Sequence, residues 1–409
     1  FPIWKETFCV NYLAEGEQPS LQELRDTLDF VLALQDSDMK DFDVGDLCNG
    51  LAIMDCPISD HRLFRLLQIA NTRFWRIRFS QNQSRILATS ANAQIVFRMC
   101  ELDSSFAQAC MEERGPTDIS FLFNIPIPSQ ELAQLTRSRH LQRLSLDHIN
   151  LSLESAQVLA NAGLENISLG HYVRCHPPLS TAKFITQIVR EQVGPTGLEF
   201  KYISRIWGRN NWQSFCRALR DGNRRLKRLM IHNGMNLYWR EHSQLCFFDS
   251  VKHNHGLEEI WLTTGCLPDN NKFCAFIMKL LWAVASHPTL LRLKFDTRIA
   301  GLQHRRLGSA LKDFCQQVAK ALGGNHQIED IKITFRDMAS KEVLFDERQY
   351  WDKLVTPILE CNIYRKLLAA MINEADDETR PGLLSTALAS VRNHKYQFGL
   401  PQRRPFFAE

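Results

Sequence analysis

The stretch Leu226-Lys227-Arg228-Leu229-Met230-Ile231 reads apolar-x-x-apolar-x-apolar, and its first residue lies three positions after Asn223. The same pattern returns at residues 164–169 and 257–262, each time three residues after an Asn. The middle apolar positions are Ile167, Leu198, Leu229 and Ile260, and successive members are 31 residues apart. A fixed period of this kind is the sequence signature of a solenoid, in which each unit stacks on the next.

Further copies of the pattern lie on both sides of this region, at shorter steps before it and at longer steps after it. The pattern predicts about eleven strands, and the others lie at Cys48-x-x-Leu51-x-Ile53, Phe74-x-x-Ile77-x-Phe79, Ile95 with Phe97, Phe121 with Phe123, Leu144 with Leu146, Leu290-x-x-Leu293-x-Phe295 and Ile328-x-x-Ile331-x-Ile333. Helical apolar spacing falls between them, for example at residues 60–67, 181–193, 212–219 and 272–285. Because each strand returns through a helix on one side, neighbouring strands must be parallel.

The pattern assigns a side to every strand residue. Its apolar positions point into a core between strands and helices, and the residues between them face the open side of the sheet. Strands pack about 4.8 Å apart and helices about 10 Å apart, so the stack is expected to curve with its strands inside. The Asn before each strand is expected to adopt left-handed geometry and to close the preceding helix, and its side chain can also bond exposed backbone groups.

These residues resemble the leucine-rich repeat family in its helix-containing, ribonuclease-inhibitor-like form, over residues 46–340. The resemblance implies an α/β fold, a curved solenoid with parallel strands on the concave face and helices on the convex face. Residues 1–45, which hold the capping box Ser20 to Glu23, form an N-terminal cap in this interpretation. Residues 341–409 form a helical C-terminal cap and tail, with one helix beginning at Pro381, and this closing segment resembles that of algal members of the family.

Composition restricts the class of protein. The chain has 409 residues, a net charge of +4 and 44% hydrophobic residues, with no apolar run long enough to span a membrane. It opens on Phe1 without Met, and no signal peptide is recognisable. Its 12 Cys include no C-x-x-C pair, which favours a reducing compartment and an intracellular, cytoplasmic location.

No catalytic motif emerges, so we predict that the chain is not an enzyme and holds no cofactor. It contains no phosphate-binding loop, no H-E-x-x-H and no G-x-S-x-G. Cys175 and His176 are neighbours, but a metal ion needs further ligands at defined spacing. Asp147 and His148 are adjacent without a recognisable nucleophile. The basic stretch from Arg217 to Arg228 is interpreted as a solvated surface or as a contact for an acidic protein, and nucleic acid is not predicted.

The open side of the sheet is the predicted binding surface. Repeat geometry places Met230 and Trp261 there as lateral neighbours, beside Arg228, Arg292 and Lys294. Exposed Trp, Met and Arg are enriched in protein interfaces. The alternative, given equal weight, is that a loop or a terminal segment covers Trp261. On the rim, Trp207 and Tyr238 are also 31 residues apart. They either hold a partner or pack on other aromatic residues to stiffen the loops.

We therefore predict a non-catalytic scaffold that binds a protein partner on the concave face and repeat rim. One alternative is the substrate-receptor subunit of a ubiquitin ligase, although residues 1–45 lack a clear F-box pattern. Another is a stoichiometric structural subunit of a large intracellular assembly, whose binding surface would extend over helices and caps.

Overall fold

The computed structural model shows repeated strand–helix units, and the chain divides into two compact units, Phe1–Leu257 and Glu258–Glu409. The structure describes residues 51–54, 58–69, 72–90, 94–112, 115–123, 127–170, 173–175, 180–191, 193–201, 207–221, 225–232, 241–267, 270–285, 287–299, 307–323, 325, 327–337 and 352–374. The cap predicted for residues 1–45 and the helix predicted from Pro381 lie outside the described residues.

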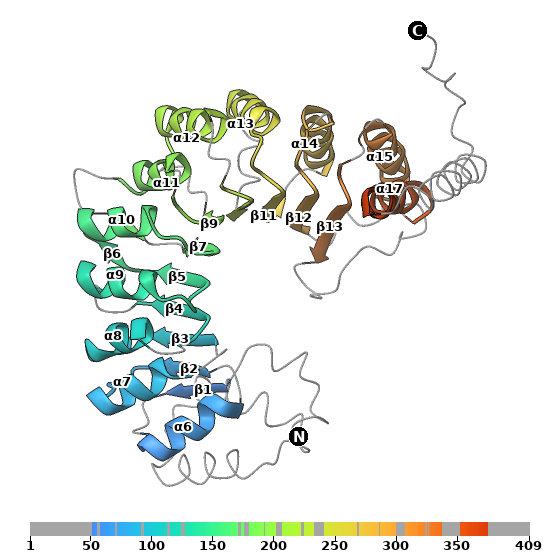
Figure 1. Ribbon diagram of the computed structural model, residues 1–409. Helices are drawn as coiled ribbons and strands as arrows, with labels where there is room; N and C mark the ends of the chain where they lie inside the picture. The colour runs from blue at the N-terminus through green and yellow to red at the C-terminus, as the bar shows by residue number, and fades with distance from the viewer. Residues whose placement is uncertain are drawn as a thin grey trace. The chain divides into compact units, whose positions relative to one another are not determined.

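In the first unit, strands and helices alternate along the chain (Figure 1). The described elements are β1 (Leu51–Met54), α6 (Asp60–Ile69), β2 (Thr72–Trp75), α7 (Gln81–Ala88), β3 (Gln94–Arg98), α8 (Ser105–Glu112), β4 (Asp118–Leu122), α9 (Ser129–Arg137), β5 (Arg143–Asp147), β6 (Asn150–Leu151), α10 (Leu153–Ala160), β7 (Asn166–Leu169), β8 (Arg174–Cys175), α11 (Thr181–Arg190), β9 (Gly197–Lys201), α12 (Arg209–Asp221), β10 (Arg228–His232) and α13 (Glu241–His253).

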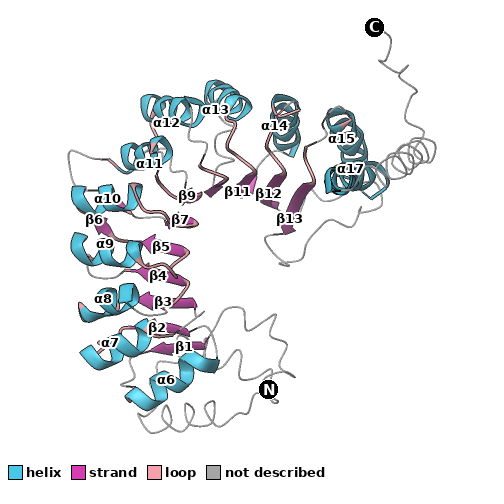
Figure 2. Ribbon diagram, in the orientation of Figure 1, coloured by secondary structure: helices cyan, strands magenta, loops and turns pink. Residues whose placement is uncertain are grey.

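The main strands of this unit pair in sequence order, from β1 through β2, β3, β4, β5, β7 and β9 to β10, and each of these pairs is parallel. The short strands β6 and β8 pair separately. The helices between β1 and β7 lie along one face of the sheet, as Figure 2 shows. The predicted parallel arrangement is confirmed, because a helix lies between each main strand and the next and returns the chain to the same end.

The alternation of buried and half-buried residues explains how the strands form. In β3, Ile95 and Phe97 are fully buried, whereas Val96 between them is half-buried on the other face. The ring of Phe97 stacks between those of Phe74 and Phe121, with centroid distances of 6.0 and 5.6 Å. Farther along the sheet, the 31-residue step places Ile167 opposite Leu198, and Leu198 opposite Leu229.

Two strands differ from the prediction in their register. We expected Phe74, Ile77 and Phe79 to form one strand pattern, but β2 is Thr72–Trp75, and Thr72 lies opposite Ile95. We expected Phe121 with Phe123, but Ile119 and Phe121 pair with Leu144 and Leu146, and Phe123 follows the strand. In β2 the physical reason is that Ile77 and Phe79, beyond the strand, are also buried. The same apolar spacing therefore fits two alternative frames, that is, two assignments of the apolar residues to the positions of the strand.

A left-handed residue directly follows each of the strands β2, β3, β4 and β5. Among the described residues, the non-glycine residues with positive φ are Arg76, Met99, Phe123 and His148, at 53° or 54°. The backbone N–H of Arg76 donates to Arg98 O at 2.9 Å, and those of Met99 and Phe123 donate to Leu122 O and Asp147 O at 3.0 Å. Each of these three turns is thus tied to the end of the next strand.

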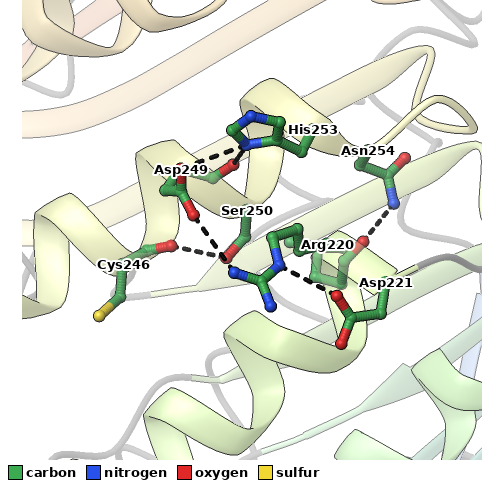
Figure 3. Close-up of polar contacts among 8 residues, drawn as sticks. Arg220, Asp221, Cys246, Asp249, Ser250, His253 and Asn254 are labelled. Carbon is green, nitrogen blue, oxygen red and sulfur yellow. Dashed lines mark hydrogen bonds and ion pairs between the residues drawn. The ribbon is translucent and has the colours of Figure 1, made fainter.

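The helix layer is built from capped amphipathic segments. Ser80 and Gln83 form a capping box at the start of α7. In α11, Phe184, Ile185, Ile188 and Val189 are buried, as the apolar spacing predicted. Side chains also join α12 to α13, because Arg220 contacts both Asp221 at 3.0 Å and Asp249 at 3.8 Å (Figure 3).

The second unit contains longer strands. Its described elements are β11 (Glu259–Leu267), α14 (Asn270–Ala283), β12 (Arg292–Ile299), α15 (Leu307–Leu322), β13 (Asp330–Asp337) and α17 (Thr356–Glu374). β12 pairs in parallel with both β11 and β13, and the register between β11 and β12 shifts between Thr263 and Cys266. Leu293 and Phe295 of β12 are buried at the positions that the repeat pattern assigns to the core.

The Asn before the strand does not adopt the predicted left-handed geometry, and this part of the prediction is wrong where the residue is described. Asn161 ends α10 with a φ of −97°. Asn254 and Asn325 are buried, and each side chain bonds backbone groups of its own loop and of the preceding repeat. Asn325 Nδ2 donates to Val284 O and Ala285 O, and its Oδ1 accepts from the N–H groups of Gln327 and Ile328 at 2.8 Å. The side chain therefore satisfies backbone groups of two repeats at once.

The last described helix takes the place of a further repeat. Asn362, on α17, donates to Asn325 O at 3.1 Å and to Ile328 O at 2.7 Å, as a repeat Asn would. Instead of a strand, the helix continues, and Lys366 Nζ lies 2.6 Å from Glu329. None of the helices in the described part of the chain is long and apolar enough to span a membrane.

Candidate functional site

The sheet face opposite the helices, here called the open face, carries the residues predicted to bind a partner. In the first unit, Arg228 lies at the start of β10, where its Nη2 is 3.6 Å from a Glu165 carboxylate oxygen and donates to Glu165 O at 3.3 Å. Met230 is half-buried and lies opposite Glu199 of β9. The Arg228 cation is thus already paired with a carboxylate of its own chain.

In the second unit, three further predicted residues form a compact group on the open face. Trp261 lies opposite Lys294, whose Nζ is 5.6 Å from the centroid of the indole ring. Glu259 contacts both cations, at 2.8 Å from Lys294 and 3.8 Å from Arg292. The tryptophan is therefore held by a cation–π contact and an ion-pair network. Met230 and Trp261 belong to different units, so their predicted adjacency stays a prediction.

Of the predicted rim pair, the structure describes Trp207, and this residue does not lie on the surface. Trp207 is only 2% exposed, and its ring packs against Phe200, Trp212 and Phe215 at centroid distances of 5.3 to 5.6 Å. This matches the alternative in which the rim aromatics pack on one another, so we remove Trp207 from the candidate surface. Tyr238 lies outside the described residues.

A second group, which the sequence prediction missed, lies at the carboxyl ends of β2 to β5. It consists of Trp75, Arg98, Phe123 and His148, and we call it the carboxyl-end stack. Trp75 and Arg98 are the last residues of their strands, and Phe123 and His148 are left-handed residues that follow theirs. Because the strands are parallel and in register, these side chains come from one edge of the sheet.

The planar groups of the carboxyl-end stack lie against one another in order. The Arg98 guanidinium carbon is 4.1 Å from the centroid of the Trp75 ring and 5.3 Å from that of Phe123. Phe123 and His148 are stacked with their ring centroids 3.6 Å apart. His148 Nδ1 lies 3.0 Å from Asp147 Oδ1. Phe123 and His148 thus contact each other through their ring faces, and Arg98 lies between Trp75 and Phe123.

Buried hydrogen-bond donors without a partner distinguish this stack from the group around Trp261. Trp75 Nε1 and Arg98 Nε are both buried and have no hydrogen-bond partner. Buried donors of this kind are uncommon, and each calls for an explanation such as strain or an absent ligand. Four left-handed non-glycine residues in the same repeat position are a second unusual feature, and such strain tends to gather at functional sites.

Asp147 connects the carboxyl-end stack to the next strands. Its side chain lies over Gly170, where an added Cβ would come within 2.2 Å of Asp147 Cγ. A residue with a Cβ at this position would therefore require the Asp147 side chain to shift. Burial lowers the pKa of Lys201 on β9, and attraction to Asp147 partly opposes this shift. The open face thus carries opposite charges on β5 and β9, the two strands that flank β7.

The described polar clusters do not form a recognisable catalytic arrangement. In the network of Figure 3, Ser250 Oγ donates to the carbonyl oxygen of Cys246 at 2.6 Å, while His253 contacts Asp249. Burial raises the pKa of the Cys110 thiol to about 12 and that of Cys175 to about 11, which disfavours the reactive thiolate. No group of three or more His, Cys, Asp or Glu that could hold a metal ion occurs among the described residues.

Comparison with known proteins does not assign the chain to a family. No protein-family model matches it, and a search of curated proteins finds no match.

The carboxyl-end stack was missed because of the register errors in β2 and β4. If Phe74 is the first apolar position, the pattern places Arg76 and Arg78 on the open face, whereas the observed strand places Arg73 and Trp75 there. Because Phe123 was assigned to the core of the strand, its position after β4 and its contact with His148 were not predicted. The spacing of Phe74, Phe97, Phe121, Leu146 and Leu169, at steps of 23, 24, 25 and 23, is the signal that would have found the frame.

Proposed function

We propose that this chain is a non-catalytic, intracellular protein-binding scaffold of the leucine-rich repeat type, and that its partner binds on the open face of the strands. In this proposal the solenoid curves with its strands on the concave side and is capped by residues 1–45 and 341–409. The parallel strand–helix repeats and their 31-residue step support the repeat type. Solenoids of this class offer extended surfaces rather than deep pockets.

The observation that carries the proposal is the kind of side chain on the open face. Its positions hold large, half-buried residues next to charges, such as Trp261 beside Lys294 in the second unit and Trp75 beside Arg98 in the first. Tryptophan and arginine are the residues most enriched among the energetic centres of protein interfaces. They are held in place by stacking, so a partner would not have to order them on binding.

Lysine-directed crosslinking of the natively purified chain with its partner tests the proposal. Lys201, Lys294 and Lys332 lie on open-face positions of β9, β12 and β13. Lys183, Lys252 and Lys320 are exposed on helices α11, α13 and α15 and act as internal controls. We expect intermolecular crosslinks at the first set and few at the second. Crosslinks confined to the helix lysines would contradict the proposal.

A matched pair of variants adds an energetic test. Trp261→Ala removes a half-buried indole from the open face, and we expect it to weaken partner binding by at least about tenfold, as for an interface anchor. Trp282→Ala removes an indole that is 53% exposed on α14 and should leave binding nearly unchanged. Equal binding by wild type and Trp261→Ala would remove this residue from the interface.

A structural-subunit role remains the second candidate, because some helices expose apolar side chains. On α17, Ile363, Tyr364 and Leu367 are 41%, 41% and 59% exposed and share a helical face by their spacing. Exposed apolar groups that cluster mark contact surfaces more often than single residues do. This role predicts that Leu367→Ser, rather than Trp261→Ala, disrupts co-purification of the partner in fixed ratio.

A further inference from the structure

The charges of this chain are separated along its length. Residues 1–50 contain eleven acidic residues and three basic ones, a net charge of −8, although the whole chain carries +4. Within this part, residues 36–46 hold five Asp and one Lys. The five aspartates are Asp36, Asp38, Asp41, Asp43 and Asp46. Such an acidic block is typical of a segment that binds a basic surface.

The complementary charge lies immediately downstream. Residues 72–101 contain five Arg and a single acidic residue, Glu101, so this short part of the chain has a net charge of +4. Of these arginines, Arg73 and Arg98 lie on open-face positions of β2 and β3, and Arg76 is the exposed left-handed residue beside Trp75. Arg78 pairs with Glu101 at 2.6 Å. The basic patch therefore surrounds the Trp75 end of the carboxyl-end stack.

The acidic block is tethered within reach of this patch. Asp46 precedes Leu51, the first residue of β1, by five residues, and β1 pairs with β2. The patch thus begins one strand spacing, about 5 Å, from β1, and extends to β3 at about 10 Å. The ends of these strands lie about 13 Å from the start of β1, since each residue advances about 3.3 Å. The eight to ten residues from Asp41 or Asp43 to Leu51 span up to about 25 to 35 Å when extended.

We propose that the carboxyl-end stack is a docking surface for an acidic peptide, and that residues 36–46 of the same chain are its occupant. The aspartates would accept hydrogen bonds from the edges of Arg98, Arg76 and Arg73, and Met39 and Phe42 would supply apolar contacts next to Met99, which is 44% exposed. The short tether gives the segment a high effective concentration at the patch. This inference does not rest on partner binding by the open face, although a partner that uses the stack must displace the segment.

A peptide fits this surface better than a nucleic acid does. Single-stranded nucleic acids bind through aromatic faces on which bases stack, but the faces of Phe123 and His148 are stacked on each other and Arg98 covers Trp75. The cations are concentrated on β2 and β3, and the open face carries Asp118, Asp147 and Glu199 on later strands. A phosphate backbone that followed the sheet would meet these carboxylates.

Hydrogen exchange of the full-length chain tests the proposal directly. Exposed charge pairs each contribute little, so we expect exchange in residues 36–46 to be slowed by on the order of tenfold, and less at high salt. Arg76→Asp with Arg98→Asp should remove this protection. Adding Asp41→Arg with Asp43→Arg to that variant should restore it. Arg85→Asp is the matched control, because Arg85 is exposed on the helix α7 and should leave the protection unchanged.

Several outcomes would overturn the inference. These are no protection of residues 36–46 in the wild type, equal protection after charge reversal, or equal loss with Arg85→Asp. Protection that rises with protein concentration would assign the segment to a second copy instead, and protection gained only on adding an acidic peptide or an oligonucleotide would assign the surface to that ligand. If charge reversal at Arg98 unfolds β3, Asp41→Asn with Asp43→Asn decides, since it changes only the segment and should lose the protection.

Discussion

The short repeats of β2 to β5 and the long repeats of β11 to β13 differ in the hydrogen bonds that hold the loops beside their strands. In the short repeats, strands of four or five residues are each followed by a left-handed residue, and three of these residues donate a backbone N–H to the next repeat. In the long repeats, strands of eight or nine residues carry the pairing, and before β12 and β13 a buried side chain accepts backbone N–H groups of its own loop. That side chain is Asn325 before β13 and His287 before β12.

The two regions therefore differ in their strained backbone residues and in the side chains that satisfy their buried backbone groups. A non-glycine residue in left-handed geometry costs about 1 kcal/mol or more, and the short repeats bear that cost four times. In return, the turns bring Phe123 and His148 to the carboxyl edge, where they extend the stack. In the described residues of the long repeats no non-glycine residue has a positive φ, and Asn325 and His287 satisfy backbone groups through side-chain acceptors. Three substitutions test this comparison.

Replacing Asn325 should have the largest effect. Asn325→Ala removes four hydrogen bonds and leaves buried backbone groups without partners, so we expect the second unit to lose about 3 kcal/mol of unfolding free energy. Asn161→Ala, at the same repeat position before β7, removes an exposed bond to Gln157 O and should cost less than about 1 kcal/mol. Urea unfolding of both variants measures the difference. Equal losses would show that the Asn position has one role throughout.

Replacing Met99 should have a smaller effect of opposite sign. Met99→Gly relieves the positive φ while its backbone N–H still bonds Leu122 O, so we expect a gain of about 0.5 to 1 kcal/mol. Met111→Gly is the control, because this methionine is similarly exposed, 40% against 44%, but lies in helix α8. There glycine should cost about 0.5 to 1 kcal/mol. Thermal unfolding distinguishes the two, and a loss in both variants would contradict strain at Met99.

Replacing Asp118 should have the smallest effect, and that effect should depend on pH. Burial raises the pKa of Asp118 on β4, and Arg143 only partly opposes this. The fold therefore favours the protonated carboxyl group, and its contribution to stability is lost as pH rises through the raised value. Asp118→Asn should stabilise the protein by less than about 1 kcal/mol at pH 7 and by nothing below the ordinary pKa of 3.8.

Chemical unfolding at pH 7 and at pH 3 measures this effect, and Asp330→Asn, at the first position of the long-repeat strand β13, is the matched comparison. A gain that is equal at both pH values would contradict the assigned cause.

Periodicity was sufficient to predict much of the fold. The step of 31 residues placed Ile167, Leu198 and Leu229 opposite one another because a repeat length fixes the register of stacked strands. The helix at 181–190 followed from Phe184, Ile185, Ile188 and Val189. The positions of Arg228, Trp261, Arg292 and Lys294 on the open side followed from strand alternation. Their binding role remains a prediction.

The sequence by itself determined that this chain is built from strand–helix repeats with parallel strands, because apolar spacing and period depend on local geometry alone. It also determined the separation of an acidic block from a basic one. The apolar spacing within β2 left two assignments open, since Ile77 and Phe79 are buried beyond the strand and satisfy the same spacing, and the tertiary structure decided between them. The carboxyl-end stack likewise depends on contacts between residues about 25 positions apart, such as Phe123 and His148. No local pattern encodes such a contact, because it forms only when neighbouring strands meet in register.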